Sequence, residues 1–321
     1  MIKTAVVGMK WGYYHALNIK NKRIPGVKLV AVCDTNPEKS FFKNDPGVPL
    51  YKEINELLAK EKIDAVILAI PHHLHYEYTI KCLDKKIPVY IEKPIAQDTN
   101  QAEKMIESAE KNNCVLVVGH QRRFSGYTMK LKHLLKNRID KITGIHISFA
   151  GVKEDEYFKI EWHREKGAGP LLINHIHDID DLRFIAGEIK NVCGFISNRI
   201  RNLEVEDTCV GFLELESGIP VDLFASDVSV RVSEYSHIFY GKTETYAIPP
   251  LVKFVLDKKG ERKTINLKFP QTDSLLLCEK EFFSAIKENR KLNSPVEAYK
   301  NLKVIEALKE SWIKKKVIPI K

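Results

Sequence analysis

Residues 4–15 read Thr-Ala-Val-Val-Gly-Met-Lys-Trp-Gly-Tyr-Tyr-His, an apolar run that ends in a glycine-containing turn. The turn of a dinucleotide-binding fold has the pattern Gly-x-Gly-x-x-Gly, whose middle glycine lets the backbone approach a pyrophosphate. Here Gly8 and Gly12 stand one residue closer together than the outer glycines of that pattern, and no glycine lies between them. By itself, this turn is equally typical of a plain strand-to-helix connection.

Asp34 favours the cofactor interpretation. It follows a second apolar run, residues 28–33, and stands 22 residues after Gly12. An acidic residue at about this distance binds the ribose 2′-hydroxyl of NAD, whereas its charge repels the 2′-phosphate of NADP. The alternative is an aspartate in an ordinary β-turn. We therefore predict NAD rather than NADP. The expected contacts in the turn and at the second strand are Gly8, Met9, Lys10, Trp11, Gly12 and Asp34.

Short apolar runs alternate with helical patterns over the first 120 residues. The predicted strands are residues 4–7, 28–33, 65–70, 89–91 and 115–118, and the predicted helices include 54–60, 76–84 and 99–113. Continuous Val/Ile/Leu runs separated by amphipathic helices indicate a parallel sheet covered on both faces. We expect a doubly wound α/β domain, which binds its ligands beyond the carboxyl ends of the strands.

Two further loops begin where predicted strands end. Pro71, His72 and His75 follow the run 65–70, and Glu92 and Lys93 follow the run 89–91. Such loops flank the nicotinamide half of the cofactor in a doubly wound sheet, so we expect these residues to contact it. The competing interpretation is that they are solvated turn residues.

From residue 141 the pattern changes to consecutive strands. They are predicted at 142–149, 192–200, 208–215, 221–228, 236–240, 252–256 and 262–267, with one helix at 171–186 and two closing helices at 275–288 and 295–315. This order predicts an α+β domain with a large, mostly antiparallel sheet. We place the dinucleotide-binding domain at residues 1–122 and the substrate-binding and oligomerisation domain at 123–321, with the last helix able to pack back on the first domain.

The helix at 171–186 carries polar residues beside an apolar stripe. The stripe consists of Leu172, Ile176, Ile179, Leu182 and Ile185. Asn174, His177 and Asp180 or Asp181 share another face. His175 and His177 are two residues apart and point in different directions on a helix, so no metal site is predicted. Histidine is a suitable base for removing a hydroxyl proton during hydride transfer. A solvated polar face is the simpler alternative.

The composition excludes several other classes of protein. The 321 residues are 44% hydrophobic and carry a net charge of +9, which we interpret as a lysine-rich surface because no nucleic-acid motif is present. The six cysteines form no Cys-x-x-Cys pair, so neither a disulfide framework nor a zinc site is expected. The longest strongly apolar run, 65–70, is too short to span a membrane, and we expect no signal peptide at the N-terminus. We expect a cytoplasmic protein.

These features together resemble the Gfo/Idh/MocA family, named for glucose–fructose oxidoreductase, inositol dehydrogenase and a rhizopine-catabolism protein. The matching motifs are Val7-Gly8 to His15, Glu92-Lys93-Pro94, Gln121-Arg122-Arg123-Phe124, Gly167 to His177 with Asp180, Val205-Glu206-Asp207-Thr208, and the terminal residues Phe282, Ala285-Ile286 and Ile305-Glu306-Ala307. The resemblance covers nearly the whole chain. Its most specific part is Glu-Lys-Pro after a strand, followed some 80 residues later by His-x-x-Asp.

The resemblance implies an N-terminal Rossmann domain and a role for each matching residue. Lys93 would polarise the substrate oxygen, and His177 would be the acid/base. The expected substrate contacts are Arg123, Trp162, Asn174 and Asp180. It also implies a homodimer or homotetramer formed through the open face of the C-terminal sheet. One departure is Ile173, which stands where inositol dehydrogenases of the family have an aspartate.

Three functions compete at this stage. The first is an NAD(H)-dependent oxidoreductase acting on a secondary carbinol or ketone of a sugar, cyclitol or related hydroxylated small molecule. The second is a non-catalytic sensor that binds a dinucleotide. The third is an NAD-dependent glycoside hydrolase, which oxidises one hydroxyl only transiently. We favour the first, because a sensor needs no proton relay of the Lys93/His177 kind.

Overall fold

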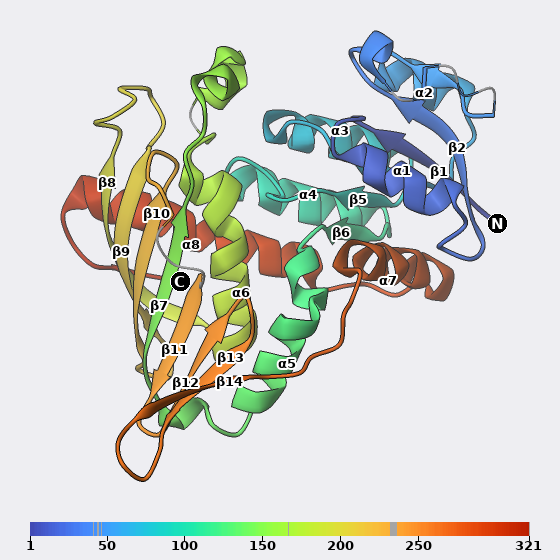
Figure 1. The fold of residues 1–321 in the computed structure, drawn as a ribbon. Coiled ribbons are helices and arrows are strands. Elements are labelled where there is room, and N and C mark those ends of the chain that lie inside the picture. The colour runs from blue at the N-terminus through green and yellow to red at the C-terminus, as the bar shows by residue number, and fades with distance from the viewer. Residues whose placement is uncertain (41, 44, 46, 166, 232–235, 321) are drawn as a thin grey trace. The chain divides into compact units, whose positions relative to one another are not determined.

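The computed structural model describes residues 1–40, 42–43, 45, 47–165, 167–231 and 236–320. The chain divides into two compact units (Figure 1). Unit 1 comprises Met1–Gln121 and Asp273–Tyr299, and unit 2 comprises Arg122–Thr272 and Lys300–Lys321. The first boundary lies one residue from the predicted one. The structure differs from the predicted division because residues 273–299, expected in the second domain, belong to unit 1.

Unit 1 contains a parallel sheet, as the alternating pattern predicts. In the described residues its strand order is β3-β2-β1-β4-β5-β6. The strands are β1 (Ile2–Val7), β2 (Val27–Cys33), β3 (Leu50–Tyr51), β4 (Ala65–Leu68), β5 (Val89–Ile91) and β6 (Leu116–Val118). The helices are α1 (Gly12–Lys20), α2 (Ile54–Lys60), α3 (His75–Asp84), α4 (Thr99–Lys111) and α7 (Ser274–Glu288).

Burial explains why these strands read as continuous apolar runs. All residues of β4 and β5 are fully buried, because helices cover both faces of the sheet. The α/β prediction is confirmed. Gly8, Asp34 and Glu92 all follow the carboxyl ends of strands, at the same edge of the sheet.

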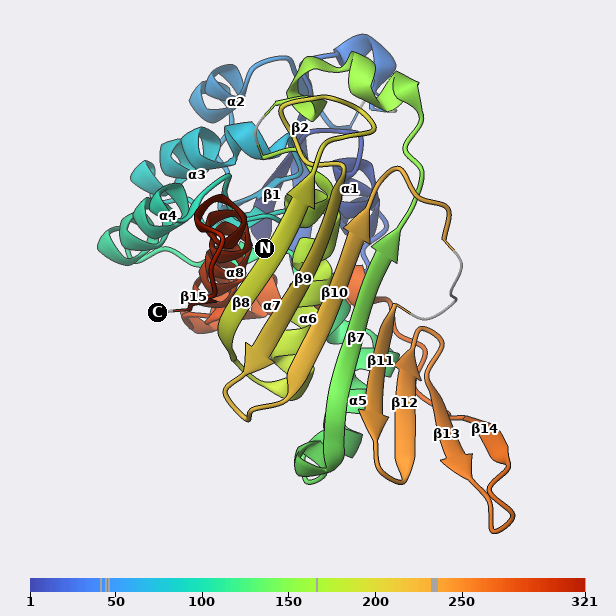
Figure 2. The same ribbon diagram turned by 90° about the vertical axis from the view of Figure 1, so that its left-hand side faces the viewer.

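Unit 2 contains a long, mostly antiparallel sheet, which is also confirmed. The strand order among the described residues is β14-β13-β12-β11-β7-β10-β9-β8-β15, and only the β7–β10 pair is parallel. The strands are β7 (Ile142–Ala150), β8 (Ile189–Ser197), β9 (Thr208–Leu215), β10 (Pro220–Ser226), β11 (His237–Gly241), β12 (Glu244–Ile248), β13 (Val252–Leu256), β14 (Arg262–Asn266) and β15 (Ile318–Pro319). Figure 2 shows β8, β9, β10 and β7 side by side, with α6 (Ile176–Ala186) and α5 (Gly126–Leu135) behind the sheet.

The helices pack closely on the covered face of this sheet. In the long helix α8 (Ser294–Lys314), Leu308 lies over two glycines of neighbouring strands. A Cβ atom added to Gly194 or Gly211 would come within 3.2 Å of the Leu308 side chain. Glycine at both positions therefore lets α8 approach the sheet. No helix of the described residues combines the length and hydropathy needed to cross a membrane.

The polar helix of unit 2 begins with a π-helical turn, Leu171–His175, and continues as α6. Its predicted apolar stripe is buried throughout. Asp178, Asp180 and Asp181 are each only 1% exposed, so the polar side of the helix is not a solvated surface. π-Helical turns are frequent at functional sites.

Candidate active site

The shortened glycine turn is a tight connection between β1 and α1. Gly8 has a φ of +87°, and a Cβ atom there would lie 2.3 Å from the carbonyl oxygen of Ala69. The Gly12 amide donates to the Gly8 carbonyl at 3.1 Å, and a Cβ atom on Gly12 would lie 2.9 Å from Val6. Both positions therefore require glycine: Gly8 for its backbone angle, and both for close packing against the sheet.

Asp34 lies against this turn. Its Oδ2 accepts from the backbone amide of Met9 at 2.6 Å, and its Oδ1 accepts from that of Asn36 at 2.8 Å. Each carboxylate oxygen has a second lone pair, so both can still accept from a ribose hydroxyl. Met9 is buried, whereas Lys10 and Trp11 are exposed.

The amino-terminal end of α1 fits a pyrophosphate. Trp11, which precedes the helix, makes no side-chain cap, and the first turn contains no acidic residue. A helix amino terminus of this kind attracts an anion through its backbone amides and its dipole. Together with Gly8 and Asp34, this end of the helix forms a cradle that suits NAD.

His75 is predicted as a cofactor contact, and its ring is held between two loops. The side chain is 1% exposed, with Nδ1 2.7 Å from the carbonyl oxygen of Pro94 and Nε2 2.9 Å from that of Ile70. Burial lowers its pKa. His75 thus links the loop after β4 to the loop after β5, next to Lys93. Of its neighbours, His72 is also buried and Pro71 is half-buried.

The side chain of Glu92 also lies in the interior of unit 1. It is buried, and its Oε1 lies 3.2 Å from Nε2 of His15 on α1. The other ring nitrogen of His15 lies 2.6 Å from Oε1 of Glu279 on α7. Burial alone would lower the pKa of His15, but its hydrogen bonds with Glu279 and Glu92 raise it from 6.5 to about 9. A charged His15 therefore links α1 to Glu92. Lys93, which follows Glu92, is half-buried.

The predicted substrate residues of unit 2 occupy two segments. His177 is the second residue of α6 and is half-buried. Asn174 lies in the π-helical turn, and its buried Oδ1 has no hydrogen-bond partner in the described part of the chain. Trp162 lies in a short 3-10 turn, Glu161–His163, where its ring meets the edge of His163. Lys93 belongs to unit 1 and His177 to unit 2.

Asp180 and Arg123 pair with each other. Asp180 accepts two hydrogen bonds from Arg123, at 2.8 Å from Nε and 2.7 Å from Nη2. Its Oδ1 also accepts from Asn301 on α8 at 2.7 Å. The carboxylate is thus buried and already engaged, and its contact with a substrate hydroxyl stays a prediction. The pair holds α6 in place.

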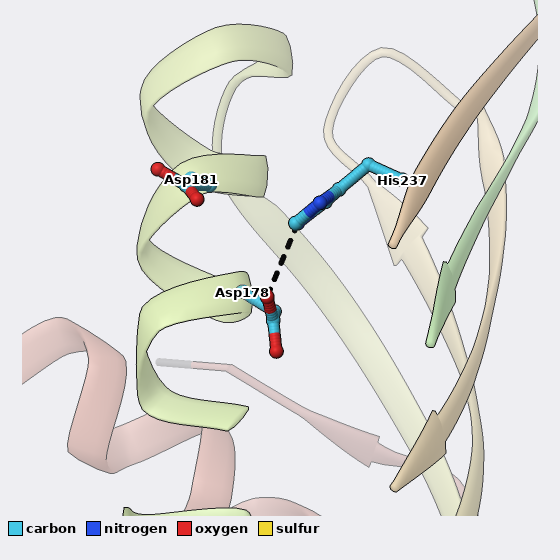
Figure 3. Close-up of side chains that lie close together, drawn as sticks. All are labelled: Asp178, Asp181 and His237. Carbon is cyan, nitrogen blue, oxygen red and sulfur yellow. Dashed lines mark ion pairs between the residues drawn. The ribbon is translucent and has the colours of Figure 1, made fainter. Parts of the chain in front are cut away.

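A second polar cluster was not found by sequence reasoning. Asp178 of α6 points toward His237 at the start of β11, and Asp181 lies on the next turn of the helix (Figure 3). One oxygen or nitrogen atom from each of the three residues lies within 4.8 Å of the others. Arg122 Nη1 lies 2.7 Å from Asp178 and 3.5 Å from Asp181. The residues also line a cavity of about 180 Å³. No spacing rule connects a helix to a histidine 56 residues further on, so only the fold reveals this group.

Burial and neighbouring charges set the protonation of this cluster. Burial raises the pKa of Asp181 to about 8, even though Arg122 opposes the shift. Arg122 and His175 overcome burial at Asp178 and hold its pKa well below the usual range. Burial lowers the pKa of His237 to about 4, so its ring is neutral.

Both halves of the chain match profiles of one family. Residues 2–120 match "Oxidoreductase family, NAD-binding Rossmann fold", and residues 128–247 match "GFO/IDH/MocA C-terminal domain".

The chain is also similar to individual relatives and to a solved structure. The chain is 29% identical over 57% of its length to 2,7-anhydro-N-acetylneuraminate hydratase of Mediterraneibacter gnavus, matching 49% of that protein. It is 28% identical over 74% of its length to scyllo-inositol 2-dehydrogenase (NAD(+)) of Bacillus subtilis, matching 69% of that protein. The match thus spans about half of the first relative. The crystal structure of scyllo-inositol dehydrogenase from Lactobacillus casei with NAD(H) and scyllo-inositol has a TM-score of 0.79 at 23% identity, covering 100% of this chain and 99% of that one. It shows the same fold.

Proposed function

The chain belongs to the Gfo/Idh/MocA family of NAD-binding oxidoreductases, and from this membership we propose that it transfers hydride between NAD(H) and a secondary carbinol or ketone of an inositol, sugar or related hydroxylated small molecule. The observation that carries the proposal is the cradle formed by Gly8, Asp34 and the uncapped start of α1. The similarity to an NAD-dependent inositol dehydrogenase supports the substrate class.

NAD(H), held by Gly8, Asp34 and the start of α1, would supply the hydride acceptor or donor. His177 accepts the hydroxyl proton of an alcohol substrate and returns it when a ketone is reduced. The ammonium group of Lys93 stabilises the negative charge that develops on the substrate oxygen. Asn174 and Trp162 bind and orient the substrate. Arg123 and Asp180 act as a pair that positions α6 and, with it, His177.

A substrate screen tests this proposal. Purified protein is mixed with NAD⁺ and a panel of inositols, sugars and sugar acids, and the absorbance of the reduced nicotinamide is followed. At least one hydroxylated compound should produce NADH catalytically. Tight binding of NADH without turnover of any compound would instead support the non-catalytic sensor.

The NAD-dependent glycoside hydrolase is a second candidate, in which NAD would be reduced and reoxidised within one turnover. The relative named as a hydratase favours keeping it, because a hydratase likewise catalyses no net oxidation. Its signature is conversion of the carbohydrate, detected by chromatography, without any net change in nicotinamide absorbance. The same panel therefore distinguishes the two reactions.

We predict that the protein binds NADH more tightly than NADPH and that Asp34→Ser reduces this preference by roughly 10-fold. The substitution removes the carboxylate that accepts from ribose hydroxyls and repels a 2′-phosphate. Binding is measured through energy transfer from tryptophan, because Trp11 lies in the turn. The control is Asp64→Ser, since Asp64 also accepts from a backbone amide, that of Lys3, but lies before the amino end of β4. Equal binding of both cofactors to the unmodified protein would contradict the prediction.

We further propose that the protein forms a homodimer or homotetramer through the open face of the unit 2 sheet. Phe195, Val210 and Phe212 of β8 and β9 project from this face with exposures of 60%, 41% and 59%. Phe195 pairs directly with Val210 across the two strands. Large apolar side chains gathered on one sheet face indicate a surface covered by a partner.

Phe212→Asp should therefore convert the oligomer to monomer, because the new charge would be buried in the interface. Sedimentation velocity measures the change. Leu256→Asp is the control, since Leu256 is 67% exposed on β13, away from β8 and β9 in the same sheet. A monomeric unmodified protein, or an equal loss of assembly in both variants, would contradict this proposal.

A further inference from the structure

The contacts of Ser236 permit the tautomer of His237 that a metal ion needs. The Ser236 hydroxyl can donate to the carbonyl oxygen of Ile248, 3.3 Å away. When it does, its oxygen accepts from Nδ1 of His237 at 2.9 Å. A neutral imidazole carries one proton, so in this tautomer Nε2 of His237 is an acceptor.

This bare nitrogen faces other acceptors. Nε2 of His237 is buried, has no hydrogen-bond partner among the described residues, and lies 3.6 Å from Oδ1 of Asp178. Oδ1 of Asp181 is also buried without such a partner. One donor atom from each of the three residues lies within 4.8 Å of the others. Arg122 supplies a donor to Asp178 and lies 3.5 Å from the other oxygen of Asp181, but it leaves Nε2 of His237 and Oδ1 of Asp181 without a partner. A cation between these two buried acceptors would satisfy both.

The charges of the cluster leave room for such a cation. Arg122 contributes one positive charge against the two carboxylates. His175 contacts only the far oxygen of Asp178, at 2.7 Å, and Arg231 lines the same cavity from an exposed position. With neutral histidines, and with Asp181 ionised as a metal ligand must be, Arg122, Asp178 and Asp181 have a formal charge of −1. A divalent cation carrying one hydroxide would neutralise that charge.

The donor set selects the type of cation. Imidazole nitrogen with carboxylate oxygen is typical of zinc and its first-row neighbours, whereas magnesium and calcium prefer oxygen alone. Ligands of a tetrahedral zinc lie roughly 3.4 Å apart, close to the 3.6 Å between Asp178 and His237. Oδ1 of Asp178 can keep its bond to Arg122, because a carboxylate oxygen has two lone pairs.

We propose that Asp178, Asp181 and His237 bind one divalent transition-metal ion of the zinc type, with a fourth position open to the adjoining cavity. Ser148 and Ser236 line that cavity and can hold a water or hydroxyl ligand of the ion. The three ligands come from α6 and β11, so the ion would fix the helix to the sheet within unit 2 (Figure 3). The zinc titration needs neither cofactor nor substrate, so its outcome does not depend on the proposed oxidoreductase function.

Calorimetry tests the site directly. The full chain is stripped with a chelator, dialysed and titrated with zinc chloride, and Co²⁺ is then used as a spectroscopic probe. We expect one ion per chain and the visible absorption bands of tetrahedral Co²⁺. His237→Gln and Asp181→Asn should each weaken zinc binding by roughly 100-fold, because each removes a ligand.

His146→Gln is the matched control. His146 lies 2.6 Å from Asp222 on the open face of the sheet, and this histidine–aspartate pair is able to collect zinc nonspecifically. The variant should bind zinc as the unmodified protein does. Absence of stoichiometric binding overturns the proposal, as does binding that depends on His146 but not on Asp181. Asp181→Asn nearly preserves the shape of the side chain, so this variant tests the metal site even if His237→Gln does not fold.

Discussion

Replacing His177 with alanine should lower turnover by roughly 100-fold or more while the protein remains folded. General acid–base catalysis contributes about this factor or more. Lys93→Ala should cause a loss of similar size, because it removes the charge that stabilises the developing alkoxide. Steady-state kinetics with a substrate from the screen measures both effects, which should appear in kcat rather than mainly in KM.

The pH profile separates chemistry from damage to the fold. His177→Ala should change the pH dependence of kcat, because it removes the proposed acid/base group, and NADH binding should be preserved. His133→Gln, which changes an exposed histidine of α5, should leave both unchanged. If the Lys93 and His177 variants both turn over at the original rate, the site assignment is wrong.

The second large effect concerns stability. His15→Gln should lower the free energy of unfolding at neutral pH by about 3 kcal/mol or more, since it leaves Glu92 and Glu279 buried without the charge between them. Chemical denaturation measures the change. The double variant His15→Gln/Glu279→Gln should recover part of the loss, because it removes one of the stranded carboxylates.

The same contacts predict a pH dependence. The pKa of His15 is raised from 6.5 to about 9 in the folded protein. The unfolded chain releases this proton near pH 6.5 and the folded protein near pH 9. The contribution is therefore complete below pH 6.5 and is lost as the pH rises through about 9, with a total on the order of 3 kcal/mol.

His15→Gln should flatten the fall in stability between these pH values. His133→Gln should retain it, because His133 is exposed and has no comparable partners. An identical pH dependence in the unmodified protein and the His15 variant would show that the charge on His15 contributes nothing to folding.

The elements that could be predicted from the sequence are those with strong local patterns. β5, β9, β13 and α2 have the predicted bounds. β5 is a buried, continuous apolar run, and α2 has a regular apolar stripe. β9 and β13 are each followed by a turn that contains a glycine, Gly218 or Gly260. β15 was missed, since two residues make no pattern. The π-helical turn before α6 was also missed. It differs from an α-helix in its backbone hydrogen bonds, whereas the spacing of its apolar residues is still typical of a helix.

Local pattern could not assign the partners of polar residues. The sequence places Asp180 on a polar helix face, but its partner Asn301 comes from a distant helix. His75 and Glu92 follow strand ends as predicted, yet their side chains turn inward to Pro94 and His15. A motif fixes where a residue stands along the chain, whereas its hydrogen bonds depend on segments brought together by the fold.

The return of residues 273–299 to unit 1 has a consequence for synthesis on the ribosome. Strands β1 to β6 leave the ribosome first, but Glu279, the partner of His15, is still to be translated when they do. At ordinary elongation rates the delay after residue 121 is roughly 10 to 30 s. During that time the nascent domain lacks α7 and exposes the apolar surface that Phe282 later covers at Tyr90. Chaperones that shield nascent chains would act on this early domain.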